Sequence, residues 1–168
     1  MILGLSFENF TLLHVVISLV GILSGILVLF SLLRGTRSPA LTALFLATTV
    51  LTSVTGFLFP FTTLLPSHIV GILSLVLLAA AIAGLYVFRF DGAWRWIYVV
   101  GAVASLYLNV FVGVVQAFQK LSFLQPLAPT QSEPPFIIAQ TAVLLIFVIL
   151  GFLAVRRFHP NSFTGHPA

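Results

Sequence analysis

Five uncharged stretches divide this chain, and each is long enough to cross a lipid bilayer. They cover residues 10–33, 40–59, 67–88, 96–118 and 136–155, and all ten Asp, Glu, Lys and Arg residues lie outside them. A helix rises about 1.5 Å per residue, so about 20 residues span a hydrocarbon core of about 30 Å. Backbone groups find no water in that core, so a spanning segment is either a helix or a strand of a closed barrel. The short alternating segments of a barrel are missing from the sequence. We therefore predict an all-α integral membrane protein with five transmembrane helices.

The composition narrows the class further. The chain is 60% hydrophobic and 6% charged, whereas soluble domains contain about 25% charged residues. It has no cysteine, which excludes disulfides, thiol redox chemistry, cysteine metal ligands and covalently attached haem. The basic residues lie at the ends of the apolar stretches and form no basic face, so nucleic acid is not an expected partner. We expect one transmembrane domain over residues 1–155 and a cytoplasmic tail over residues 156–168.

The positions of the basic residues predict an orientation. Six arginines follow or bracket the spans on one side of the membrane: Arg34, Arg37, Arg89, Arg95, Arg156 and Arg157. Lys120 alone lies on the other side. Cytoplasmic loops carry the excess of Lys and Arg, so the N-terminus is predicted outside and the C-terminus in the cytoplasm of a bacterial-type inner (plasma) membrane. Trp94, Trp96 and Tyr98 are then expected to form an aromatic belt at the inner surface.

Small residues recur at helical spacing within the spans. Such residues let transmembrane backbones approach closely. The predicted packing positions are Ser18, Gly21, Gly25, Gly71, Gly101, Ser105 and Gly113. We expect the first four spans to form a helical bundle, with the fifth packed against it. The same rows of small residues also suit contact with another membrane protein or with a second copy of the chain.

The pentapeptide VGILS occurs twice, at residues 20–24 and 70–74, and each copy follows a histidine in an apolar run. The two spans run in the same direction, and His14 and His68 each share a face with the glycine of their own copy. This similarity suggests a weak tandem repeat of two-helix units. The predicted direction of the two spans places both histidines in the outer half of the membrane.

Imidazole and amide side chains gather in that outer half. Such groups are costly in hydrocarbon, so they face protein or a wet cavity and are candidates for function. The predicted cofactor-binding residues are His14, His68, Asn109, Gln116 and Gln140. We expect them to form a polar pocket that opens to the outside. Interhelical hydrogen bonding is the alternative role for Asn109 and Gln116.

Several functions are compatible with such a pocket. The preferred one is an accessory, assembly or interaction subunit of the membrane, without catalytic residues. A redox protein is the alternative, in which His14 and His68 ligate one b-type haem or the pocket holds a quinone. The two histidines, with or without Glu8, are also candidate metal ligands, and small-molecule binding or transport is a further alternative. Hydrolysis is not expected, because no span contains a carboxylate that would orient a histidine base.

Overall fold

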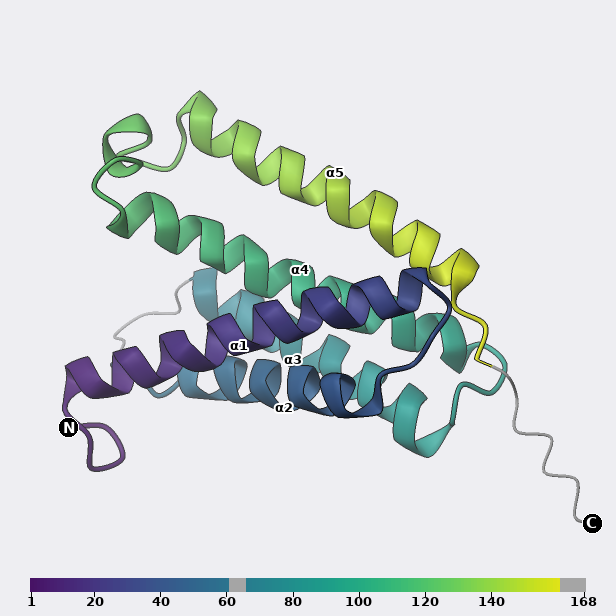
Figure 1. The fold of residues 1–168 in the computed structure, drawn as a ribbon. Coiled ribbons are helices and arrows are strands. Elements are labelled where there is room, and N and C mark those ends of the chain that lie inside the picture. The colour runs from purple at the N-terminus through teal and green to yellow at the C-terminus, as the bar shows by residue number, and fades with distance from the viewer. Residues whose placement is uncertain (61–65, 161–168) are drawn as a thin grey trace, which may run out of the picture.

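The computed structural model describes residues 1–60 and 66–160, and this part of the chain is helical (Figure 1). The long helices are α1 (Phe7–Leu33), α2 (Pro39–Gly56), α3 (Pro66–Ile82), α4 (Trp94–Lys120) and α5 (Pro134–Arg157). A π-helical turn, η1 (Ala83–Val87), continues α3, and a 3₁₀ turn, η2 (Gln125–Leu127), lies between α4 and α5. Five helical segments of the described chain are long and apolar enough to cross a membrane. The predicted all-α fold with five transmembrane helices is confirmed. Most of the predicted tail, residues 161–168, lies outside the described residues.

The helix ends differ from the predicted spans by a few residues, because local hydrogen bonds decide them. Helix α1 begins three residues earlier than predicted, where the Ser6 hydroxyl accepts a hydrogen bond from the Asn9 N–H at 3.2 Å. Helix α2 ends at Gly56 instead of residue 59. Helix α5 continues to Arg157, into the predicted tail.

The end of α3 folds back onto the bundle. After the π-helical turn, Arg89 and Phe90 have φ angles of +48° and +69°, a backbone conformation that side chains rarely adopt. The turn is held by the Phe90 N–H, which donates to the Gly84 carbonyl at 2.9 Å, and by the Phe90 ring, which packs on Tyr98 at 5.0 Å. Tyr98 is therefore only 3% exposed and does not belong to the predicted aromatic belt, whereas Trp96 is 48% exposed.

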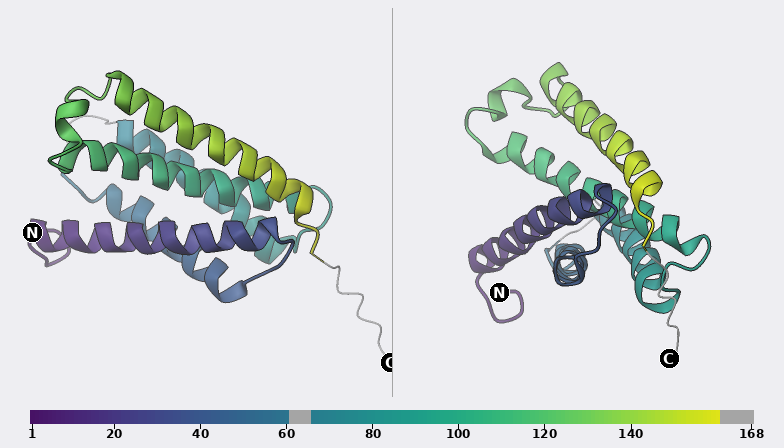
Figure 2. Two further views of the ribbon diagram at one scale, coloured as in Figure 1. Left: turned by 45° about the horizontal axis from the view of Figure 1, so that its top comes forward. Right: turned by 45° about the vertical axis from the view of Figure 1, so that its right-hand side comes forward.

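Helix α4 is the centre of the bundle and contacts each of the other long helices. Half of the residues in its most apolar stretch are buried, compared with 6% of those in the corresponding stretch of α5. Figures 1 and 2 show α5 alongside α4, outside the group formed by α1 to α4. This arrangement agrees with a four-helix core and a fifth packed helix. The buried core cluster consists of Val28, Leu29, Leu32, Phe45, Leu46, Leu78, Ala81, Tyr98, Val99, Ala102, Val103, Leu106, Ala154 and Phe158.

Glycines lie at the closest helix crossings. A Cβ placed on Gly25 of α1 would lie 2.6 Å from Cδ1 of Leu106 in α4. A Cβ placed on Gly101 of α4 would lie 2.8 Å from the carbonyl oxygen of Leu77 in α3. At Gly101 the obstacle is backbone, so this crossing needs glycine, whereas at Gly25 the Leu106 side chain would have to shift. By contrast, a Cβ at Gly113 would make an ordinary contact of 3.6 Å with Ile22.

Candidate functional site

A cavity of about 110 Å³ lies between α1, α2, α3 and α4, toward the end of the bundle at which α1 and α3 begin. We call it the polar cavity. It brings together His14 of α1, His68 of α3 and Asn109 of α4, three of the five residues predicted to bind a cofactor. Its polar lining consists of His14, Ser18, Thr49, Thr52, Ser53, Ser67, His68, Ser74 and Asn109.

His14 of α1 forms a side-chain hydrogen bond with Thr55 of α2. The Thr55 hydroxyl donates its one proton to backbone carbonyls of its own helix, with the Leu51 oxygen at 2.7 Å. Its oxygen lies 2.8 Å from His14 Nδ1, and the tautomer that is protonated on Nδ1 donates to it. In the neutral ring Nε2 then carries a lone pair that can accept a proton or a hydrogen bond. The Phe59 ring packs edge-on against the imidazole at 5.2 Å and holds its orientation.

His68 lies in the first turn of α3 and is 5% exposed. Its ring stacks on Phe57 at the end of α2, with the ring centroids 5.6 Å apart. The same Phe57 ring covers Gly71, where an added Cβ would lie 3.0 Å from the ring. The predicted packing position Gly71 thus lets an aromatic ring of α2 close one wall of the cavity.

Two buried hydrogen-bond donors at the cavity wall have no partner within the described residues. They are the Thr49 hydroxyl and Asn109 Nδ2. Both lie beside Gly21, where an added Cβ would be 3.2 Å from Thr49 Oγ1 and 3.1 Å from Asn109 Nδ2. An unsatisfied buried donor costs about 1–3 kcal/mol, and native proteins usually satisfy such groups with water or a ligand. Thr49 and Asn109 thus line the cavity, and each carries a buried donor without a partner on the side of Gly21.

Other hydroxyls of the cavity bond to one another across the helices. Ser18 donates to Thr52 at 3.4 Å, which joins α1 to α2, and Ser53 donates to Ser74 at 3.3 Å, which joins α2 to α3. Sequence reasoning did not identify Thr49 and Ser53 as lining residues. The signal available was their spacing of four residues, which places both hydroxyls on one face of α2.

The two predicted glutamines lie elsewhere. Gln116 is exposed. It follows Gly113 on α4, and Ile22 of α1 packs at Gly113. Gln140 Nε2 donates to the Phe111 carbonyl at 3.1 Å and so joins α5 to α4. Its Oε1 is buried without a partner among the described residues. Neither glutamine lines the polar cavity.

The described residues contain no group of three or more His, Cys, Asp or Glu side chains placed to hold a metal ion. The version of the metal site in which Glu8 joins His14 and His68 is therefore not formed. The cavity also limits any cofactor by size, because sites for larger ligands measure about 300–1,000 Å³ and this one measures about 110 Å³. The polar cavity, at this volume, is smaller than a haem.

Comparisons of the chain with models of known protein families, with curated proteins and with solved structures found no match. The structure shows a helical bundle with five helices long and apolar enough to cross a membrane, and a polar cavity among four of them.

Proposed function

We propose that this protein binds, within the bilayer, a small ring compound that forms hydrogen bonds, and that the headgroup of a quinone or quinol is the class that fits best. One observation carries the proposal: the buried donors of Thr49 and Asn109 share the cavity wall and lack partners in the described structure. The carbonyl oxygens of a quinone accept such hydrogen bonds. A quinol hydroxyl would donate to His14 Nε2, which the Thr55 hydrogen bond leaves as an acceptor.

The cavity takes part of one ring. An engineered protein cavity of about 150 Å³ holds benzene, and the polar cavity, at about 110 Å³, is smaller, so a quinone ring would enter it with one carbonyl first. The apolar tail of a membrane quinone would extend into lipid. A single b-type haem ligated by His14 and His68 is not proposed, because its macrocycle exceeds this space.

The test is a calorimetric titration of the purified protein, in mild detergent, with a short-chain benzoquinone and with its quinol. We expect saturable binding that Asn109→Leu weakens about tenfold or more, because the substitution removes the donor and keeps a similar volume. His14→Ala should weaken quinol binding more than quinone binding. His159→Ala is the matched control, because His159 is exposed and does not line the polar cavity.

The same variants separate ligand binding from helix packing. If Asn109 donates to a ligand, Asn109→Leu leaves the ligand-free protein as stable as before, or more stable, since an orphaned buried donor disappears. A loss of stability together with unchanged quinone affinity would assign Asn109 to packing and overturn the proposal. A visible spectrum with a Soret band that His14→Ala or His68→Ala removes would also overturn it, in favour of haem.

We propose as a second candidate an accessory or assembly subunit, and the burial of α5 favours it. Ala154 is the one buried residue within this helix, and its remaining apolar surface is open to a neighbour in the membrane. A photo-crosslinking residue at position 145, exposed on α5, should then capture one membrane protein in stoichiometric amount. The same label at position 13, exposed on α1, is the control. Crosslinks to lipid alone at both positions would exclude this function.

A further inference from the structure

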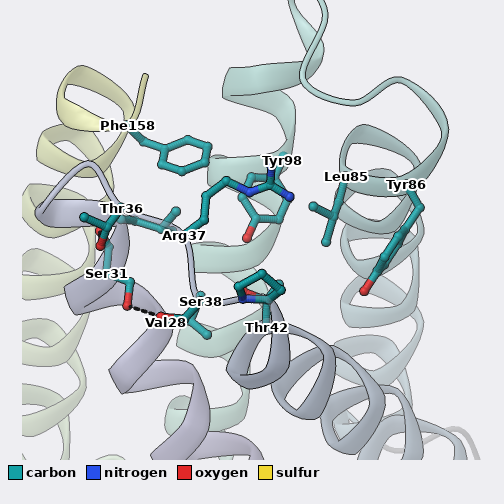
Figure 3. A pocket seen from close by; sticks show the side chains of 12 residues that line it. Val28, Ser31, Thr36, Arg37, Ser38, Thr42, Leu85, Tyr86, Tyr98 and Phe158 are labelled. Carbon is teal, nitrogen blue, oxygen red and sulfur yellow. Dashed lines mark hydrogen bonds between the residues drawn. The ribbon is translucent and has the colours of Figure 1, made fainter. Parts of the chain in front are cut away.

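A second cavity, of about 50 Å³, lies at the opposite end of the bundle, where α1 ends and α2 begins (Figure 3). We call it the arginine pocket, after Arg37 in the loop between these helices. Hydroxyl groups supply most of its polar lining: Ser31, Thr36, Ser38, Thr42, Tyr86 and Tyr98. The π-helical turn after α3 brings Leu85 and Tyr86 to the pocket, and such turns are frequent at functional sites.

Arg37 is held at this pocket without an anionic partner. Its guanidinium carbon lies 4.9 Å from the centroid of the Phe90 ring, a cation–π contact that fixes the side chain. Figure 3 shows the side chain reaching across the pocket to the side of Tyr98. Within the described residues it makes no hydrogen bond or ion pair. Its N–H groups are therefore available to a ligand, in the planar fork that suits phosphate.

The charge around the pocket is strongly positive. Six of the seven basic residues of the chain lie at this end of the bundle, whereas Asp91 is the one carboxylate side chain there and Glu8 and Glu133 lie at the other end. No carboxylate lines the pocket. The field at this end thus favours an anion and disfavours a cation.

The base of the pocket presents the Tyr98 hydroxyl as a neutral donor, and the Thr42 hydroxyl forms a hydrogen bond with Tyr98. The Thr42 and Tyr98 side chains are buried, at 6% and 3% exposure, and both line the pocket below the guanidinium. Helix α2 begins at the same wall, and Ser38 at its N-cap position forms no cap hydrogen bond with its side chain. The Ser38 hydroxyl instead forms a hydrogen bond with the Ser31 hydroxyl at the end of α1, at 3.1 Å.

We propose that the arginine pocket binds one phosphate group, with the Arg37 guanidinium group at the mouth of the pocket and hydroxyl groups at its base. A volume of about 50 Å³ holds roughly three to five water molecules, which suits one tetrahedral phosphate and excludes a nucleotide. The phosphate belongs either to the headgroup of an anionic lipid at this membrane surface or to free inorganic phosphate. Basic pockets between transmembrane helices are known to bind anionic lipid headgroups.

Calorimetric titrations of the purified protein in neutral detergent test this proposal. The probes are dihexanoyl-phosphatidylglycerol, inorganic phosphate and, as the phosphate-free control, dihexanoylglycerol. We expect Arg37→Gln to weaken phosphate binding about tenfold or more, because two charge-assisted hydrogen bonds are lost. Arg34→Gln removes the same charge from the same loop but does not line the pocket, so it should weaken binding less than about threefold.

Two further variants keep the test decisive if Arg37→Gln fails to fold. Arg37→Lys keeps the charge and loses the fork, and Tyr98→Phe keeps the ring and loses the hydroxyl, so both should weaken binding severalfold. Tight binding of phosphatidylglycerol alone identifies a lipid headgroup as the source, and binding of inorganic phosphate with the same dependence on Arg37 identifies the free ion. Equal losses in Arg34→Gln and Arg37→Gln, or equal binding of dihexanoylglycerol, would overturn the proposal.

Discussion

Replacing Gly101 by alanine should push α3 and α4 apart. The added Cβ would lie 2.8 Å from the carbonyl oxygen of Leu77 and 3.2 Å from Cβ of Ala81. An ordinary C···O contact is about 3.3–3.6 Å, so the helices must separate by about 0.5 Å or more. Overpacking of this kind costs about 1–3 kcal/mol. We expect a cost in the upper half of that range here, because a backbone carbonyl, unlike a side chain, cannot rotate away from the added methyl group. Alanine recovers about 0.8–1.0 kcal/mol of helix propensity. We therefore expect the free energy of unfolding to fall by about 1–2 kcal/mol.

Gly113→Ala is the matched control on the same helix. Its Cβ would lie at an ordinary contact distance of 3.6 Å from Ile22. No steric clash then offsets the higher helix propensity of alanine, so the free energy of unfolding should rise by up to about 1 kcal/mol. Both variants can be unfolded reversibly in mixed micelles with increasing SDS and followed by circular dichroism at a helix wavelength. A difference of about 2 kcal/mol between the two variants is expected. Equal changes in the two variants would refute the claim that close backbone approach is the reason for glycine at position 101.

Three further predictions follow from single contacts. Thr55→Val removes the acceptor of the His14 hydrogen bond. It should lower the free energy of unfolding in mixed micelles by about 0.5–1 kcal/mol. A double-mutant cycle with His14→Ala should show coupling, whereas additive losses would mean that the hydrogen bond contributes nothing. Arg95→Gln removes a donor to two carbonyls at the end of α5, at 2.7 and 2.8 Å, so amide hydrogen exchange should accelerate in the last turn of α5 and not in α1. The Glu133 carboxylate is weakly desolvated, which raises its pKa, but hydrogen bonds from the Thr130 hydroxyl and N–H outweigh this and hold the pKa below the usual range. The stability that these bonds contribute is therefore present above the pKa of the carboxyl in the unfolded chain. It is lost as the pH falls through the lower pKa of the folded protein. Thr130→Val should bring the NMR titration midpoint of Glu133 closer to that of an ordinary glutamate.

Much of the fold was predictable because hydropathy in a membrane protein is a local property. A run such as residues 136–155 has to be helical in lipid whatever its neighbours are, and the structure has α5 over Pro134–Arg157. The helix ends were less predictable, since they depend on single hydrogen bonds such as the one accepted by Ser6. The left-handed turn at Phe90, which buries Tyr98, had no local signal at all.

The candidate site was predictable in part. His14, His68 and Asn109 were identified because imidazole and amide groups are rare and costly in hydrocarbon, and the structure places all three at one cavity. Thr49 was not identified, because a hydroxyl can bond to its own helix backbone and so gives no sign of its surroundings.

The sequence by itself determined the number of helices, their approximate limits and the concentration of arginines at one end of the bundle. Only the tertiary structure decided which faces meet. Lipid and a protein core are both apolar, so the hydrophobic pattern of a membrane helix hardly distinguishes its buried face from its exposed one. Two residues on one side of α4, two turns apart, show the difference. Asn109 lines a cavity among four helices, whereas Gln116 is exposed, and Ile22 of α1 packs at Gly113 between them.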